Sequence, residues 1–217
     1  MTDTTNKTNS NYQNVWTAHK SISNARFLAV TAMLSALAFV LMYLDFAIPF
    51  LIPGFVKMDF SELPALIAAF SMGPVSGVMV CLIKNLLHLF VTSTGGIGEL
   101  CNFLLGAAFV LPAGLIYQHK KTKKTAIGGA LVGAISMAII SFPVNLFITY
   151  PVYEQLYFGG SVEPIIGMYR EILPAVQNLW QCLLIFNAPF TFVKGLLSVI
   201  ITLFIYKPLS PVLHGRQ

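Results

Sequence analysis

The stretch Gly54-Phe-Val-Lys-Met-Asp-Phe-Ser-Glu-Leu-Pro64 is a short polar break between two strongly apolar runs. It places Lys57, Asp59 and Glu62 within six residues of each other, in a chain that is otherwise poor in charge. Because the apolar runs on both sides have the character of membrane spans, we expect this break to lie where a bilayer protein meets water. We interpret it as the lid and part of the wall of a ligand pocket.

The composition places the chain among membrane proteins. Of its 217 residues, 56% are hydrophobic and only 10% are charged, whereas an average globular domain carries about 25% charged residues. Apolar runs near the ~20 residues that cross a hydrocarbon core recur along the whole length. The sequence therefore predicts an all-α integral membrane protein, with one compact domain embedded in the lipid bilayer and no soluble module.

Polar and proline-rich breaks divide the apolar sequence into six expected membrane helices. Pro151 is expected to end the fifth helix, and Pro174 and Pro189 are expected to bend the sixth. Ser61 is expected to cap the second helix, and the polar segment 153–170 has room for a short interfacial helix. The expected helices span residues 27–50, 61–72, 75–91, 98–117, 126–150 and 173–206.

Both ends of the chain are expected to lie outside the helical bundle. Residues 1–24 are rich in Thr, Asn, Ser and Gln, so they cannot bury enough apolar surface to fold alone. We therefore predict a disordered tail at 1–24, a six-helix membrane domain that binds the substrate at 25–210, and a C-terminal tail at 211–217.

The distribution of basic residues predicts the orientation in the membrane. Three precede the first expected helix, four lie at 120–124 and two follow the last helix. With six spans all nine fall on one face, which the positive-inside rule assigns to the cytoplasm together with both termini. The opposite loops carry an acidic balance. The formal net charge of +5 therefore orients the protein, and we expect no nucleic-acid partner.

The sequence lacks three motifs that are typical of catalytic or metal-binding proteins. A Gly-x-x-x-x-Gly-Lys-Ser/Thr phosphate loop, a His-Glu-x-x-His motif and a Cys-x-x-Cys motif are all missing from the chain. The four histidines are scattered, and the three cysteines lack metal-ligand spacing. We therefore expect neither a metal site nor a built-in ATPase, and we keep a membrane enzyme that turns over a substrate as an alternative.

Polar side chains inside the apolar helices are the candidates for a ligand site. Such groups are costly in hydrocarbon and usually face the bundle interior, a partner or water. The structural alternative is that they only hydrogen-bond one helix to another. Because they are spread over four helices, we favour a cavity for a flat, partly polar organic ligand. The candidates are Lys84, Asn85, Asn102, Asn145, Asn187 and Lys194 in the helices, Tyr150 at a helix end, and Phe55, Val56, Lys57, Met58, Asp59 and Phe60 in the loop.

A stripe of small residues lies on the first expected helix. Ala32 and Ala36 stand one turn apart, and Ser35 widens the same surface. Small residues at this spacing allow another helix to approach closely. Packing within the bundle is the alternative, since the same pattern recurs at Gly73 and Gly77.

Motifs along the whole chain resemble the S-components, or substrate-binding subunits, of energy-coupling factor vitamin transporters. The general family resemblance is carried by Ala32-x-x-x-Ala36, the stretch 50–64, Gly73-Pro-Val-Ser-Gly77 and Lys84-Asn-Leu-Leu87. Three further motifs look like the riboflavin-specific type, and the similarity runs from about residue 27 to 206. They are Asn102-Phe-Leu-Leu-Gly-Ala107, Pro143-Val-Asn-Leu146 and Phe186-Asn-Ala-Pro-Phe-Thr-Phe-Val-Lys-Gly195.

The resemblance implies a six-helix subunit of the cell membrane that binds riboflavin as its transported ligand near the extracellular face. The loop from Phe55 to Phe60 would cover the ring system, and Asn145, Asn187 and Lys194 would contact its edges or the ribityl chain. The resemblance also implies a transmembrane coupling subunit and two cytoplasmic ATPase subunits, with Ala32, Ser35 and Ala36 at the docking surface. The alternatives are FMN or another flat vitamin as the ligand, or a facilitator that transports without ATPases.

Overall fold

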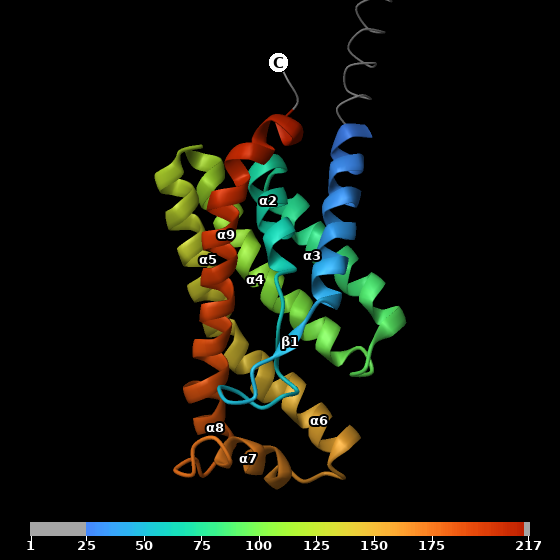
Figure 1. The fold of residues 1–217 in the computed structure, drawn as a ribbon, viewed down its shortest axis with the longest axis vertical. Coiled ribbons are helices and arrows are strands. Elements are labelled where there is room, and N and C mark those ends of the chain that lie inside the picture. The colour runs from blue at the N-terminus through green and yellow to red at the C-terminus, as the bar shows by residue number, and fades with distance from the viewer. Residues whose placement is uncertain (1–24, 215–217) are drawn as a thin grey trace, which may run out of the picture.

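The computed structural model describes residues 25–214, so the tail predicted at 1–24 lies outside the described residues, as do residues 215–217. Most of the described chain is helical (Figure 1). The longer helices are the first helix (Ala25–Tyr43), α2 (Glu62–Met72), α3 (Pro74–His88), α4 (Ile97–His119), α5 (Lys123–Val144) and α9 (Ala188–His214). The shorter elements are the strands β1 (Phe46–Ala47) and β2 (Lys57–Met58), the 3-10 turn η1 (Leu89–Val91), the π-helical turns η2 (Asn145–Thr149) and η3 (Leu183–Asn187), and the helices α6 (Tyr150–Tyr157), α7 (Glu163–Arg170) and α8 (Leu179–Cys182).

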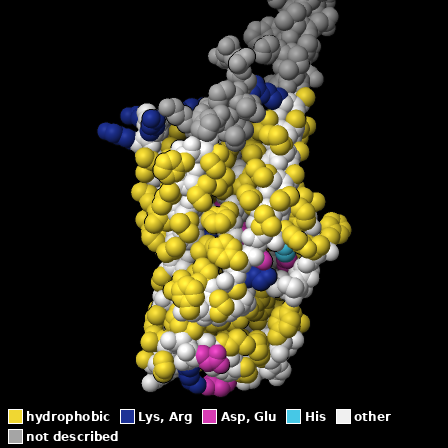
Figure 2. All heavy atoms as spheres, viewed as in Figure 1, with side chains coloured by type: hydrophobic (Ala, Val, Ile, Leu, Met, Phe, Trp, Pro, Cys, Tyr) yellow, Lys and Arg dark blue, Asp and Glu magenta, His cyan; other side chains and the backbone are white. Residues whose placement is uncertain are grey.

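Five helical segments of the described chain are long and apolar enough to cross a membrane. Hydrophobic side chains cover the middle of the molecule in Figure 2, as expected of a surface that faces lipid. α2 is also apolar, but its 11 residues extend only about 16 Å at 1.5 Å per residue. The predicted helical membrane protein is therefore confirmed, with the five spans Ala25–Tyr43, Pro74–Val91, Ile97–His119, Lys123–Tyr157 and Leu179–Ile205.

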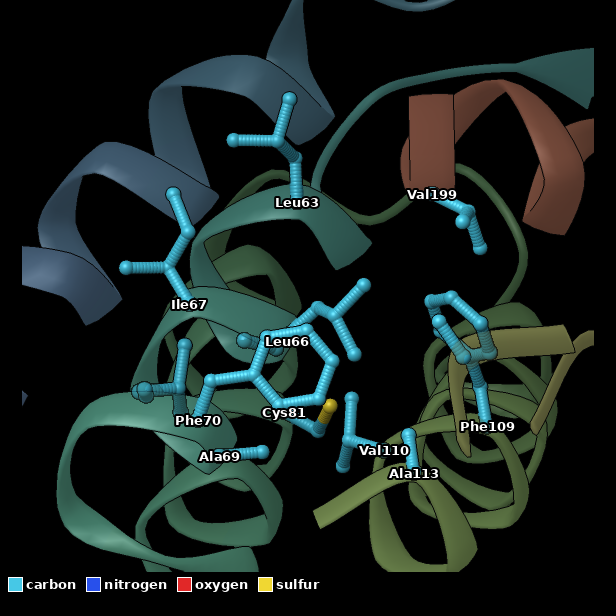
Figure 3. Packing of buried hydrophobic residues seen from close by; sticks show 14 of the residues in the cluster. Leu63, Leu66, Ile67, Ala69, Phe70, Cys81, Phe109, Val110, Ala113 and Val199 are labelled. Atoms are coloured by element: carbon cyan, nitrogen blue, oxygen red, sulfur yellow. The ribbon is translucent and has the colours of Figure 1, made fainter. Parts of the chain in front are cut away.

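The core of the bundle forms where α2 packs against α3, α4 and α9. Residues 62–70 of α2 are all buried, as expected of a helix that is apolar nearly all round. Figure 3 shows Leu66 of α2 close to Cys81 of α3 and Val110 of α4 in this cluster. Gly77 brings α3 close to α2, because a Cβ atom there would lie 2.8 Å from the Cβ of Ala69. These contacts fix α2 and thereby position the segment that precedes it.

A small β-hairpin connects the first helix to α2. The first helix ends at Tyr43, so the predicted extension to Phe50 is wrong. Pro49 disfavours the helical conformation for Ile48, so residues 48–50 could not continue the helix, which already ends at Tyr43. The chain turns back instead, and β1 and β2 pair as antiparallel strands. We call residues 45–61 the hairpin loop.

Each π-helical turn ends two residues before a proline that the helix tolerates. Pro151 is the second residue of α6, and Pro189 is the second residue of α9. In η2 the backbone N–H of Tyr150 reaches the carbonyl of Asn145. The helix then restarts with proline in its first turn, where a backbone N–H is not needed. The prediction that Pro151 ends the fifth helix is therefore wrong, since the helical segment continues to Tyr157.

The last membrane helix begins later than predicted. Residues 171–178 form turns that contain Pro174, and the helix starts only at Leu179. Pro174 therefore precedes this helix and does not bend it. The polar segment 153–170 contains α7, the short helix that was predicted there.

The two ends of the bundle differ in their elements and their charges. The start of the first helix, the turn between α4 and α5, and the end of α9 lie at one end in Figure 1, and α6 and α7 lie at the other. The first of these ends includes Arg26 and the lysines of 120–124. Figure 2 shows basic side chains gathered there, and acidic side chains together with a basic one at the opposite end.

Candidate ligand site

Four charged side chains meet inside the bundle, and we call them the charge cluster. Asp59 lies in the hairpin loop, Glu62 begins α2, Lys84 lies on α3 and Lys194 lies on α9. Lys194 Nζ donates to Asp59 Oδ2 at 2.8 Å, and Lys84 Nζ donates to Glu62 Oε1 at 3.0 Å. The side chains of Glu62 and Lys84 are fully buried, and those of Asp59 and Lys194 are 7% and 11% exposed. The cluster is neutral, with two acids and two lysines.

Ser61 closes the charge cluster into a ring. Lys84 Nζ also donates to Ser61 Oγ, and the backbone N–H of Ser61 donates to Asp59 Oδ1 at 2.8 Å. The prediction that Ser61 caps α2 is wrong, because its side chain accepts the lysine and makes no capping bond. The carboxylate of Asp59 thus accepts hydrogen bonds from Lys194 and from the backbone of Ser61, which offset the cost of burying its charge.

The charge cluster joins the hairpin loop to three helices. Taking an ion out of water costs several kcal/mol even after relaxation, so each buried charge needs an opposite partner. Lys84 and Lys194 can lie in apolar helices because Glu62 and Asp59 neutralise them. The sequence predicted Asp59, Lys84 and Lys194 as site residues, and the structure brings these three together.

Aromatic side chains hold the tip of the hairpin loop, and we call them the aromatic cluster. The ring of Phe55 meets those of Tyr150, Tyr153 and Tyr169 edge-on, with ring centroids 6.1, 6.4 and 6.3 Å apart. Edge-to-face pairs at about 4.5–7 Å are favourable, because the positive edge of one ring meets the negative face of another. The tip of the loop is thereby packed against α6 and α7.

A closed set of hydrogen bonds lies at the base of the aromatic cluster. Asn187 Nδ2 donates to the Tyr150 hydroxyl at 2.9 Å, which pairs with the Tyr169 hydroxyl at 2.5 Å. The Tyr169 hydroxyl donates to Asn187 Oδ1 at 2.5 Å. Burial raises the pKa of Tyr169 well above its ordinary value, so its hydroxyl remains a donor. The polar atoms of Asn187 are thus already paired within the protein.

The charge cluster and the aromatic cluster adjoin along two elements. Met58 is buried with the apolar residues around Tyr150 and directly precedes Asp59 in the chain. Phe190 belongs to the same apolar core and lies one turn before Lys194 on α9, so both face the same way. The site therefore offers aromatic rings at one end and charged groups at the other.

Asn145 presents an amide that the protein itself does not use. It opens the π-helical turn η2 and is half-buried. Among the residues that the structure describes, its side-chain amide has no hydrogen-bond partner. Asn145 is therefore available to a ligand in a way that Asn187 is not.

The remaining predicted residues of the hairpin loop lie nearer its surface. Lys57 is exposed and pairs with Asp45 at 2.9 Å (Nζ to Oδ2). Val56 is half-buried and packs against the apolar core around Tyr150. Phe60 is half-buried against the ring of Phe46, with centroids 6.2 Å apart.

Two predicted amides lie apart from both clusters. Asn85 Nδ2 donates to the carbonyl of Cys81 at 2.7 Å, within its own helix. Asn102 Nδ2 lies 3.9 Å from Met42 Sδ, which links α4 to the first helix. Only the Asn102 contact links two helices, as the structural alternative expects, and the side-chain oxygens of both asparagines are buried without a hydrogen-bond donor among the described residues.

The small-residue stripe of the first helix is divided between two environments. Ala32 and Ala36 are exposed on the outer face of the helix. Ser35 is buried, and its hydroxyl donates to the carbonyl of Thr31 at 2.8 Å. The outer face therefore carries the two alanines, while Ser35 packs within the bundle.

Tyr153, Tyr169 and Glu62 belong to the two clusters but were not among the predicted site residues. Tyr169 lies four residues after Ile165, and both are buried on one face of α7. This helical spacing in a segment that looked polar is the signal that could have found it. Glu62 could have been found from charge balance, since two lysines in apolar helices require two acids.

The sequence and fold of this chain match a known family. Residues 26–206 match the ECF transporter, substrate-specific component family. A solved structure described as "Structure and mechanism of the S component of a bacterial ECF transporter" is 34% identical, with a TM-score of 0.66 over 89% of this chain and 99% of that one. The chain therefore belongs to the substrate-specific components, or S-components, of energy-coupling factor (ECF) transporters. It is a multi-pass protein of the cell membrane, and its family comprises transporter components and not enzymes.

Two relatives within this family are named riboflavin transporters. Riboflavin transporter RibU of Staphylococcus aureus (strain TCH60) is 35% identical over 187 residues, which are 86% of this chain and 91% of the relative. Riboflavin transporter FmnP of Bacillus subtilis (strain 168) is 31% identical over 193 residues, or 88% and 95% of the two chains. The predicted resemblance to riboflavin-specific S-components is confirmed.

Proposed function

We propose that this S-component binds riboflavin for uptake into the cell. The observation that carries the proposal is the junction of the aromatic cluster with the charge cluster beneath the hairpin loop. The isoalloxazine rings of riboflavin are flat and apolar on their faces but carry hydrogen-bonding groups at their edges. A site with aromatic side chains at one end and oriented polar groups at the other suits such a ligand. The names of relatives at 35% and 31% identity support the same ligand.

In this proposal the ligand takes the place of the Phe55 side chain among the three tyrosines. The hairpin loop then moves outward and covers the ring system from above. Asn145 supplies an unused amide to a ring edge or the ribityl chain, and Lys194 supplies a cation from the charge cluster. No covalent step is needed for binding.

Spectroscopy of the purified protein tests the ligand directly. A co-purified flavin absorbs visible light, which no amino acid side chain does, and titration of the flavin-free protein quenches riboflavin fluorescence. FMN in a parallel titration tests the alternative ligand, since its phosphate calls for more cationic donors than Lys57, Lys84 and Lys194 provide. Absence of quenching by riboflavin, with the protein folded by circular dichroism, would refute the proposal.

Exchanging Asn145 for leucine is expected to weaken riboflavin binding about tenfold to hundredfold. A ligand group buried against leucine loses its hydrogen bond but keeps its desolvation cost, about 1–3 kcal/mol. Asn187→Leu is expected instead to lower the stability of the ligand-free protein, because two tyrosine hydroxyls lose their partner. Fluorescence titration and thermal unfolding in detergent measure the two effects.

Asn102→Leu is the matched control for both asparagine variants, because Asn102 lies outside both clusters. It is expected to leave affinity and stability nearly unchanged. If Asn145→Leu binds riboflavin as the parent does, Asn145 does not line the site. If its affinity falls only in step with its stability, Asn145 holds helices together and contacts no ligand.

We also propose that the chain crosses the membrane six times, with both termini in the cytoplasm. The sixth crossing consists of α2 and the buried segment before it. α2 runs antiparallel to the first helix (Figure 1). The clustering of Arg26 and the lysines of 120–124 at one end supports a cytoplasmic assignment for that end. Cysteines introduced singly at Lys124 and Gly160, in a variant lacking native cysteines, test this in intact cells. An impermeant thiol reagent should label position 160 and not 124, and the reverse would overturn the orientation.

The partners that we propose are a transmembrane coupling subunit and two cytoplasmic ATPase subunits. The phosphate-loop motif is missing from this chain, so the energy for uptake would come from those subunits. The outer face with Ala32 and Ala36 is the proposed docking surface. A facilitator, the alternative, would support riboflavin uptake in cells that lack the ATPases, whereas our proposal expects none.

A further inference from the structure

One oxygen of the charge cluster has no hydrogen-bond donor. Glu62 Oε2 is buried and accepts no hydrogen bond from any residue that the structure describes. The ammonium of Lys194 lies 3.4 Å away, within ion-pair distance but beyond a good hydrogen bond. Lys194 instead directs a hydrogen bond at 2.8 Å to Asp59 in the hairpin loop. Glu62 thus carries a second acceptor beside Lys194.

We infer that Glu62 is a positioning residue that holds Lys194 in place while the hairpin loop opens for the ligand. The inference rests on the proposed function, in which the loop must move to admit riboflavin. When the loop carries Asp59 away, Lys194 turns to Glu62 Oε2 and remains paired. A shift of about half an ångström brings the 3.4 Å separation to an ordinary N–H···O distance.

The other charges of the cluster explain why Lys194 needs Glu62 when the hairpin loop opens. Without Glu62, an opened loop would leave Lys194 buried on α9 with no acid beside it, at the large cost of an unpaired charge. Lys84 cannot replace Glu62, because it is itself a cation, and Ser61 Oγ is already bonded to Lys84. Glu62 therefore lowers the cost of opening, whereas the bond from Lys194 to Asp59 favours the closed loop.

The test removes Glu62 without creating a new unpaired charge. Glu62→Leu combined with Lys84→Met deletes one acid and one base, which leaves Asp59 and Lys194 as a neutral pair. Asp59→Asn, the opposite change, weakens the closed state and leaves Glu62 in place. Hydrogen–deuterium exchange of the backbone amides of residues 46–58, on ligand-free protein in lipid nanodiscs, reports how often the loop opens.

The two variants are expected to change exchange in opposite directions. Loop amides of the double variant should exchange at least about tenfold more slowly than the parent, because opening now strands Lys194. Loop amides of Asp59→Asn should exchange at least about tenfold faster. A purely structural role for Glu62 predicts faster exchange in the double variant too, since any loosening of α2 loosens the loop, and that result would overturn the inference.

Stopped-flow riboflavin fluorescence separates this inference from the proposed function. In the double variant, the association and dissociation rate constants for riboflavin should each fall about tenfold. The dissociation constant, which is their ratio, should change by less. If the parent binds riboflavin and both rate constants match in the double variant, the inference fails and the proposed function stands. If the parent does not bind riboflavin, the proposed function fails, and the exchange experiment still decides whether Glu62 eases opening.

Discussion

Replacing Lys84 by methionine is expected to lower the free energy of unfolding by about 3–5 kcal/mol, the cost of breaking a buried ion pair from one side. The substitution leaves Glu62 fully buried, with only Lys194 at 3.4 Å to neutralise it while Lys194 also bonds Asp59. The charge cluster then carries one excess negative charge inside the bundle. Unfolding by SDS in mixed micelles, without ligand, measures the loss.

Two further variants give this prediction its controls. Adding Glu62→Leu to Lys84→Met should recover most of the loss, because replacing both partners of a buried pair by apolar residues is often neutral or stabilising. Lys57→Met breaks the surface pair with Asp45, in which the Lys57 side chain is 48% exposed. This change should cost less than about 1 kcal/mol of stability. If Lys84→Met is no worse than Lys57→Met, the charge cluster does not stabilise the fold.

The helical membrane class could be predicted because it depends on composition and on the lengths of apolar runs. The predicted α2 bounds, 61–72, agree with Glu62–Met72 in the structure. Pro64 suits the first turn of a helix, and Gly73, with φ 107°, adopts a conformation that favours glycine and ends it. Local residues set these bounds, so local reasoning found them.

The hairpin and the π-helical turns could not be predicted, because each depends on contacts far along the chain. Pro151 normally ends a helix, but η2 shifts the hydrogen bonds by one residue so that the proline needs no N–H. The packing of Tyr150 against Phe55 and Tyr169 helps to fix this geometry. The proline pattern alone does not reveal such tertiary compensation.

Only some residues of the two clusters could be predicted from the sequence, and the charge cluster shows why. A lysine in an apolar helix signals that an acid lies nearby, but it does not say whether the acid belongs to a ligand or to the protein. Asp59 pairs with Lys194 and Glu62 pairs with Lys84. The side-chain amide of Asn187 is likewise hydrogen-bonded to two tyrosine hydroxyls, whereas that of Asn145 has no partner among the described residues. Sequence therefore identified the polar groups, and only the fold distinguishes paired ones from available ones.

Replacing Ala32 or Ala36 by tryptophan is expected to reduce riboflavin uptake to the level of cells that lack this protein. Both alanines are exposed on the outer face of the first helix, so the indole points away from the bundle. A bulky ring at a contact built from small residues prevents the close approach of a partner helix. Riboflavin binding by the purified variants should stay within about twofold of the parent, because neither alanine belongs to the two clusters. Uptake in cells and fluorescence titration measure the two quantities.

Ile139→Trp is the matched control for the alanine variants. Ile139 lies on α5, away from the first helix in Figure 1, and its side chain is also exposed, at 66%. Tryptophan there should leave uptake near the parental level, because a lipid-facing position accepts a large apolar ring. Ser35→Trp should reduce binding and uptake together, because Ser35 is buried and its replacement disturbs the bundle itself. If the alanine variants behave like Ser35→Trp, the stripe serves internal packing, and if they behave like Ile139→Trp, the partner subunits dock elsewhere.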